Sequence, residues 1–136
     1  EVALLNGEDY YSNPGQRVYF LDNKSSLENI YLGINIDGMG YKEGNTAFSV
    51  YTPDKNINNL SDKIFKNKYN MVRGDPWYQG EHAILVHRNI PALAFTSNLL
   101  EEILDKVHTE EDNLDIIDRQ KVLDTAFALS EFILEV

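Results

Sequence analysis

Short, almost continuously apolar runs alternate along this chain with segments of helical spacing, and this alternation restricts the fold more than any other feature. The apolar runs are Val2–Leu5, Ile30–Ile36, Ala47–Thr52 and Ala92–Thr96. Strands that are apolar at nearly every position are typical of a sheet covered on both faces. The pattern therefore predicts an α/β fold, a three-layer sandwich with a mostly parallel mixed sheet between helices.

Apolar residues recur at helical spacing in the segments between and after these runs. The first three helical segments contain Ile57 to Phe65, Ala83 to Val86, and Leu99 to Val107. The last predicted helix runs from about Asp118 to near Glu135, with Asp115 or Asp118 as its N-cap. Its predicted buried face consists of Val122, Leu123, Ala126, Phe127, Leu129, Phe132 and Ile133.

Length and composition exclude several classes of protein. The 136 residues, 43% of them hydrophobic, suit a single domain over residues 1–136. A net charge of −10 disfavours nucleic acid and anionic membrane surfaces as partners, and no apolar run is long enough to span a bilayer. Without cysteine, a metal site must use His, Asp and Glu, and the composition does not determine the cellular compartment.

The start at Glu1, inside an expected strand, predicts that the chain is a fragment.

Four candidate site residues lie where strands or helices are expected to end. Glu8 and Asp9 follow the first apolar run, Asp37 ends the second, and His108 ends the third helical segment. In an open α/β sheet, ligands bind beyond the carboxyl ends of the strands, and carboxylate with imidazole is a donor set for a divalent metal ion. By themselves these residues have other interpretations: a solvated acidic loop, an Asp-Gly turn, and a histidine at a helix C-terminus.

Read in order, four motifs resemble those in the C-terminal half of the catalytic domain of the zinc aminopeptidases of peptidase family M28, the bacterial leucyl aminopeptidase group. The resemblance covers nearly the whole chain and implies a zinc-exopeptidase fold. The motifs are Leu4-Leu5-Asn6-Gly7-Glu8-Asp9-Tyr10-Tyr11, Ile34-Asn35-Ile36-Asp37-Gly38-Met39-Gly40, Gly80-Glu81-His82-Ala83-Ile84-Leu85-Val86 with Asn89-Ile90-Pro91-Ala92-Leu93-Ala94-Phe95, and Val107-His108-Thr109-Glu110-Glu111-Asp112.

The resemblance assigns a role to each candidate. It implies that Glu8 is the general base, that Asp9 and His108 are ligands of one zinc ion, and that Asp37 is a ligand of a second. The expected reaction is hydrolysis of peptide substrates at paired zinc ions, with release of N-terminal amino acids. The segment containing His82 resembles one that lines the substrate cleft in the family. From pattern alone, His82 and His87 are interpreted as packing or surface residues and not as ligands.

The chain departs from the family pattern in three ways. Asp9 stands where most members have Glu, and Glu81 stands where they have Asp. The family's first histidine ligand and its bridging aspartate precede the acidic pair, and only seven residues precede Glu8 here. This chain alone is therefore expected to be inactive, to bind zinc weakly, and to self-associate through an exposed sheet edge.

Two other functions are compatible with such a resemblance. One is a non-catalytic interaction module on the same fold, which the presence of Glu8, Asp9, Asp37 and His108 disfavours. The other is acyl transfer of the glutaminyl-cyclase type, which uses one metal ion. Metal titration and ammonia release from a peptide with N-terminal glutamine separate these alternatives from peptide hydrolysis.

Overall fold

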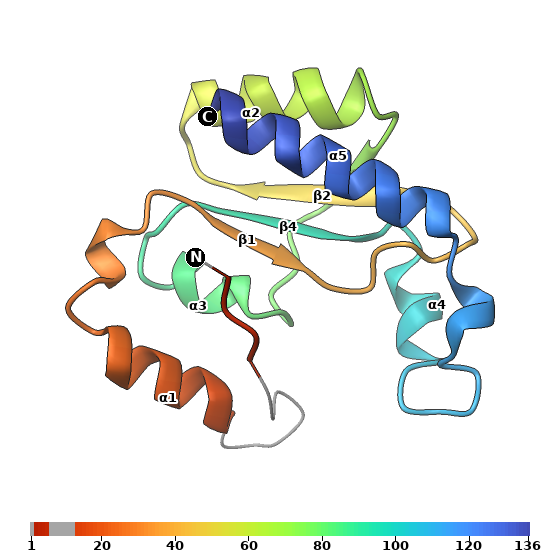
Figure 1. Cartoon of the computed structure of the whole chain (residues 1–136), viewed down its shortest axis with the longest axis horizontal. Helices are drawn as coiled ribbons and strands as arrows, with labels where there is room; N and C mark the ends of the chain where they lie inside the picture. The colour runs from red at the N-terminus through yellow and green to blue at the C-terminus, as the bar shows by residue number, and fades with distance from the viewer. Residues whose placement is uncertain (1, 6–12) are drawn as a thin grey trace.

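A mixed sheet forms the centre of the molecule in the computed structural model, which describes residues 2–5 and 13–136 (Figure 1). Its strands, in the spatial order β1-β4-β2-β3, are β1 Gly33–Ile36, β4 Ala92–Ser97, β2 Thr46–Tyr51 and β3 Val72–Arg73. The α-helices are α1 Pro14–Asn23, α2 Lys55–Ser61, α3 His82–Val86, α4 Leu100–Leu104 and α5 Arg119–Glu135. A π-helix, η2 Asp62–Lys66, and the short helices η1 Leu27–Asn29 and η3 Leu114–Ile116 complete these elements.

The strand directions confirm the predicted α/β class with a mostly parallel mixed sheet. β1 pairs with β4 and β2 pairs with β3 in parallel, whereas β2 and β4 are antiparallel. The predicted strands at 30–36, 47–52 and 92–96 are present with slightly shifted ends. β3 is only two residues long, which is too short for a hydrophobic pattern to reveal.

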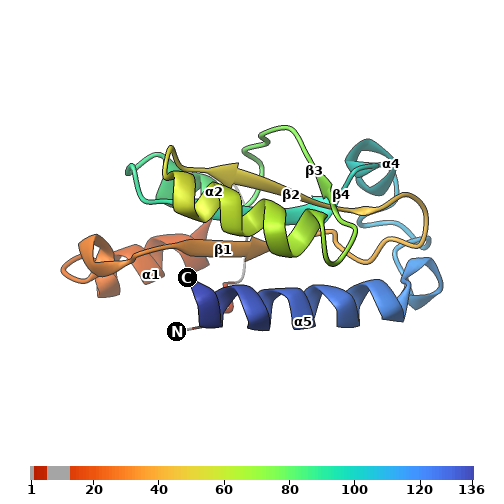
Figure 2. The same ribbon diagram turned by 90° about the horizontal axis from the view of Figure 1, so that it is seen from above.

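One face of the sheet carries the main core. Phe48 and Phe95 lie opposite each other in the register of β2 and β4 and pack against helical residues from η2 and α5. The ring of Phe65 lies 4.9 Å from that of Phe95, edge to face, and 5.0 Å from that of Phe132. Figure 2 shows α2 and α5 side by side over this face. The aromatic contacts of Phe65 and Phe132 hold η2 and α5 on the sheet.

The opposite face is covered by α3, so helices lie on both sides of the sheet and the predicted three layers are confirmed. Ile34 packs against the main core, and strand alternation turns its neighbours Gly33 and Asn35 toward α3. A Cβ added to Gly33 would collide with Leu85 Cδ1 of α3. The glycine therefore allows β1 and α3 to approach closely.

The prediction of a strand at the first apolar run was wrong. Val2–Leu5 forms no strand, and Val2 and Leu4 are 85% and 93% exposed. A strand needs a hydrogen-bonding partner, and no described strand pairs with this run. β1 lies at an edge of the described sheet, and Ile36 is half exposed there. Self-association through this edge stays a prediction.

Helix α5 begins at the predicted N-cap, because the Asp118 side chain accepts a hydrogen bond from the Gln120 amide. Its buried face is narrower than predicted and consists of Thr125, Ala128, Leu129 and Phe132. The predicted core residues Leu123, Phe127 and Ile133 are about half exposed or more. They are exposed because α5 packs on α2 and η2 along one side only. None of the described helices is long and apolar enough to cross a membrane.

Candidate active site

Asp37 lies at the carboxyl end of β1, as the sequence predicted. Its amide donates a hydrogen bond to the carbonyl oxygen of Phe95 at 3.0 Å, which continues the pairing of β1 with β4. The chain then turns at Gly38 and Gly40, whose φ angles of 70° and 90° lie in the region that favours glycine. Asp37 therefore has a rigid strand on one side and a tight turn on the other.

His108 follows α4, but it is not part of the last turn of that helix. α4 ends at Leu104, and one further helical hydrogen bond, from the Val107 amide to the Ile103 carbonyl oxygen at 2.9 Å, leads to His108. His108 is exposed and has a left-handed backbone, with φ of 64°. Its amide lies 3.5 Å from Asp112 Oδ2, a long hydrogen bond.

The acidic loop after His108 is tied to the end of the α4 segment. Lys106 forms an ion pair of 2.6 Å with Glu111, and the Lys106 carbonyl accepts a hydrogen bond from the Thr109 hydroxyl. The hydrogen bond between the two side chains raises the pKa of Lys106 and lowers the pKa of Glu111. Local contacts thus hold the acidic loop around His108.

Gly38 brings the Asp37 turn against the segment that leads to His108. A Cβ added to Gly38 would lie 3.2 Å from Thr96 Oγ1 and 3.6 Å from Ile103 Cδ1. Ile103 is buried on α4, and Thr96 belongs to β4. The Thr96 hydroxyl is buried and has no hydrogen-bond partner among the residues that the structure describes. The two candidate ligands therefore belong to segments that pack on each other.

Glu8 and Asp9, the other two candidates, lie outside the described residues. Within residues 2–5 and 13–136, no three His, Asp or Glu side chains are grouped as a metal site. Of the four candidates, the described residues contain Asp37, a carboxylate, and His108, an imidazole. Both are donor types that zinc accepts, so the chemistry of this partial set fits the metal.

His82 is the buried histidine of the described chain, with 2% of its surface exposed. Its Nε2 lies 2.7 Å from the Trp77 carbonyl oxygen, and its Nδ1 lies 3.3 Å from Asn35 Nδ2. A carbonyl only accepts, so Nε2 carries the proton, and in the neutral ring Nδ1 accepts from Asn35. The rings of Tyr51 and Trp77 lie 4.8 and 4.6 Å away. The interpretation of His82 as a packing residue is confirmed.

Burial lowers the pKa of His82, although the Trp77 hydrogen bond and the charges of Glu81 and Asp37 act in the opposite direction. With a folded-state pKa below the ordinary 6.5, the unfolded chain binds the proton first as the pH falls. This contribution to the free energy of unfolding is present above about pH 6.5 and is lost as the pH falls through the folded-state pKa. Urea unfolding between about pH 7 and pH 5 should show the decline, and H82Q should reduce it.

The matched control for this prediction is H87Q, because His87 lies one turn away and is exposed. It should leave the decline unchanged. An equal decline in H82Q and the unsubstituted protein would show that His82 does not contribute to it.

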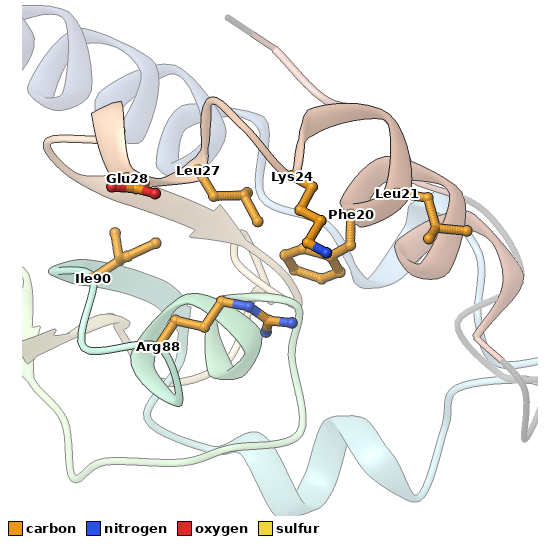
Figure 3. Close-up of a pocket in the computed structure, with 7 residues that line it drawn as sticks. All are labelled: Phe20, Leu21, Lys24, Leu27, Glu28, Arg88 and Ile90. Atoms are coloured by element: carbon orange, nitrogen blue, oxygen red, sulfur yellow. The ribbon is translucent and has the colours of Figure 1, made fainter.

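An open pocket of about 490 Å³ lies between α1 and the connection from α3 to β4 (Figure 3). No pattern in the sequence predicts this pocket. Its lining residues are Phe20, Leu21, Lys24, Leu27, Glu28, Arg88 and Ile90. The Arg88 guanidinium lies over the Phe20 ring at 4.2 Å from the centroid. Leu27 and Ile90 precede β1 and β4, so the pocket lies at the amino ends of these strands, away from the Asp37 turn.

Comparison with known proteins decides the family. Residues 1–133 match the family model described as Peptidase family M28. The chain belongs to this family. The resemblance inferred from the motifs is therefore confirmed, and the match includes all four candidate positions.

The fold is similar to that of the aminopeptidase from Aneurinibacillus sp. strain AM-1. The two structures superpose with a TM-score of 0.66 at 18% sequence identity, over 96% of this chain and 31% of the other. The chain thus spans less than a third of the length of that protein. No curated protein matches the sequence.

Proposed function

We propose that the protein containing this chain hydrolyses peptide bonds in a metal-dependent reaction and releases N-terminal amino acids at a site for two zinc ions. The observation that carries the proposal is the family match over residues 1–133. The position of Asp37 beyond β1, in a turn packed against the α4 segment, supports it.

Each candidate residue has a distinct role in this proposal. Asp9 and His108 hold one zinc ion, and Asp37 holds the other. When bound, paired divalent ions polarise the scissile carbonyl and lower the pKa of water. The Glu8 carboxylate takes a proton from the attacking water, whose oxygen bonds to the carbonyl carbon. As the C–N bond breaks, Glu8 gives that proton to the amine nitrogen of the leaving product.

Removal of the metal is the direct test. The natural protein, with whatever its gene encodes before Glu1, should hydrolyse aminoacyl-nitroanilides, and a chelator should abolish the activity. Added Zn²⁺ should restore it, because the ions supply the electrophilic chemistry. The 136 residues alone serve as the comparison and are expected to be inactive. Hydrolysis that survives complete removal of metal would contradict the proposal.

The same assay separates the two alternatives. Ammonia release from a peptide with N-terminal glutamine, without hydrolysis of nitroanilides, would indicate acyl transfer of the cyclase type. Absence of both reactions, together with absence of zinc binding, would indicate a non-catalytic interaction module.

A further inference from the structure

Lys121 of α5 inserts its ammonium group among three main-chain carbonyl oxygens. Nζ lies 2.9 Å from the oxygen of Tyr41, 2.8 Å from that of Lys42 and 2.8 Å from that of Gly44. We name these three oxygens the carbonyl cradle. An ammonium has three N–H donors, and the cradle accepts all three. No ion pair with a carboxylate involves Lys121 among the described residues.

The cradle belongs to the loop that continues from Asp37. Tyr41 is four residues after Asp37, and the turn at Gly38 and Gly40 lies between them. Figure 1 shows this loop beside the start of α5. A Cβ added to Gly40 would lie 2.8 Å from Val122 Cγ2, so the glycine allows the loop to lie directly on the helix.

Main-chain hydrogen bonds join the same loop to the segment that precedes α5. The Asp118 amide donates to the Gly40 carbonyl at 2.8 Å, and the Lys42 amide donates to the Ile116 carbonyl at 2.9 Å. Tyr41 and Ile117 form an antiparallel bridge. The Lys42 ammonium also donates to the Asp115 carbonyl oxygen at 3.0 Å. Together with the cradle, these bonds form a clasp between residues 40–44 and 115–121.

The clasp connects the two segments that carry the candidate ligands. On one side it begins three residues after Asp37, and on the other side it begins seven residues after His108. The same two segments also approach each other at Gly38, where an added Cβ would lie 3.6 Å from Ile103 Cδ1. Asp37 and His108 are therefore on chain segments that are fastened to each other at two places.

We propose that Lys121 is a positioning residue for the metal site: its ammonium, in the carbonyl cradle, sets the position of the Asp37 turn relative to the His108 loop. This inference rests on the proposed function, because it concerns the same zinc site. Hydrogen bonds from a charged donor are stronger than neutral ones, so three of them on one loop restrict its motion effectively. Residues that orient ligands from outside the coordination shell affect metal affinity about 10-fold to 100-fold.

The substitution K121M tests the proposal, because it removes the ammonium and keeps most of the side-chain stem. In the natural protein, hydrogen exchange of the Lys42 and Asp118 amides should become about tenfold faster, while the amides of β4 keep their rates. The Zn²⁺ dissociation constant, measured by chelator competition, should rise about 10-fold to 100-fold. The melting temperature of the metal-free protein should stay nearly the same.

The matched control is K63M, since Lys63 is exposed and forms one ion pair, with Glu135. It should change neither the exchange of the loop nor the affinity for Zn²⁺. Unchanged exchange in K121M, or faster exchange with unchanged Zn²⁺ affinity, would overturn the inference. Absence of Zn²⁺ binding in the unsubstituted protein would instead refute the proposed function, and the inference would fall with it.

Discussion

Replacing Glu8 by glutamine is expected to lower kcat of the natural zinc-loaded protein about 10²-fold to 10⁴-fold. An amide has nearly the shape of a carboxylate but does not accept a proton from water at neutral pH. In the proposed mechanism the carboxylate also returns that proton to the leaving amine. E8Q therefore removes the group that accepts the proton from water and the group that donates it to the amine. KM should change little, because Glu8 acts on the proton and not on substrate binding.

The Zn²⁺ affinity distinguishes this role from metal ligation. E8Q should bind Zn²⁺ almost as tightly as the unsubstituted protein, because the proposed ligands Asp9, Asp37 and His108 are unchanged. E101Q removes one carboxylate from the exposed surface of α4 and serves as the control. Its kcat should match that of the unsubstituted protein. Retention of full kcat in E8Q would contradict the role of this residue as the general base.

Replacing Phe95 by alanine is expected to have the largest effect on stability, a loss of about 3–5 kcal/mol in the free energy of unfolding. Phe95 is fully buried, and its ring packs edge to face on Phe65 and lies 6.5 Å from that of Phe48. The loss is a large share of the roughly 5–15 kcal/mol that stabilises a typical domain. Urea unfolding should show a lower midpoint with an unchanged m value.

The control for this prediction is F127A on α5, because it removes the same ring from a side chain that is 60% exposed. It should change the free energy of unfolding by no more than about 0.5 kcal/mol. Equal losses in F95A and F127A would contradict the assignment of these two rings to core and surface. The comparison also tests the finding that α5 buries a narrower face than its pattern predicts.

Sequence patterns correctly predicted those strands and helix ends whose formation depends on residues close together in the chain. The runs at 30–36, 47–52 and 92–96 overlap β1, β2 and β4 because their apolar residues match buried strands. Asp118 begins α5 because a carboxylate there accepts from the amides of the first turn. The position of Asp37 at the end of β1 was also predicted from a local pattern, because an apolar run followed by Asp-Gly ends a strand.

The predictions that were wrong depend on contacts between distant parts of the chain. Val2–Leu5 has the composition of a strand, but a strand forms only where another edge accepts its hydrogen bonds. Leu123 and Phe127 have the spacing of a buried face, but the helix packs on α2 and η2 along one side. The short π-helix η2 and the two-residue strand β3 have no sequence pattern that would predict them.

For the candidate site, the sequence by itself determined the residue types, their order and the family to which they belong. The tertiary structure decided that the turn after Asp37 packs on α4, that His82 is buried between Asn35 and Trp77, and that Lys121 holds the loop 41–44. Apart from the bond between His82 and Trp77, these contacts join residues 47 to 80 positions apart, and only the packing of the sheet against its helices brings such distant groups together.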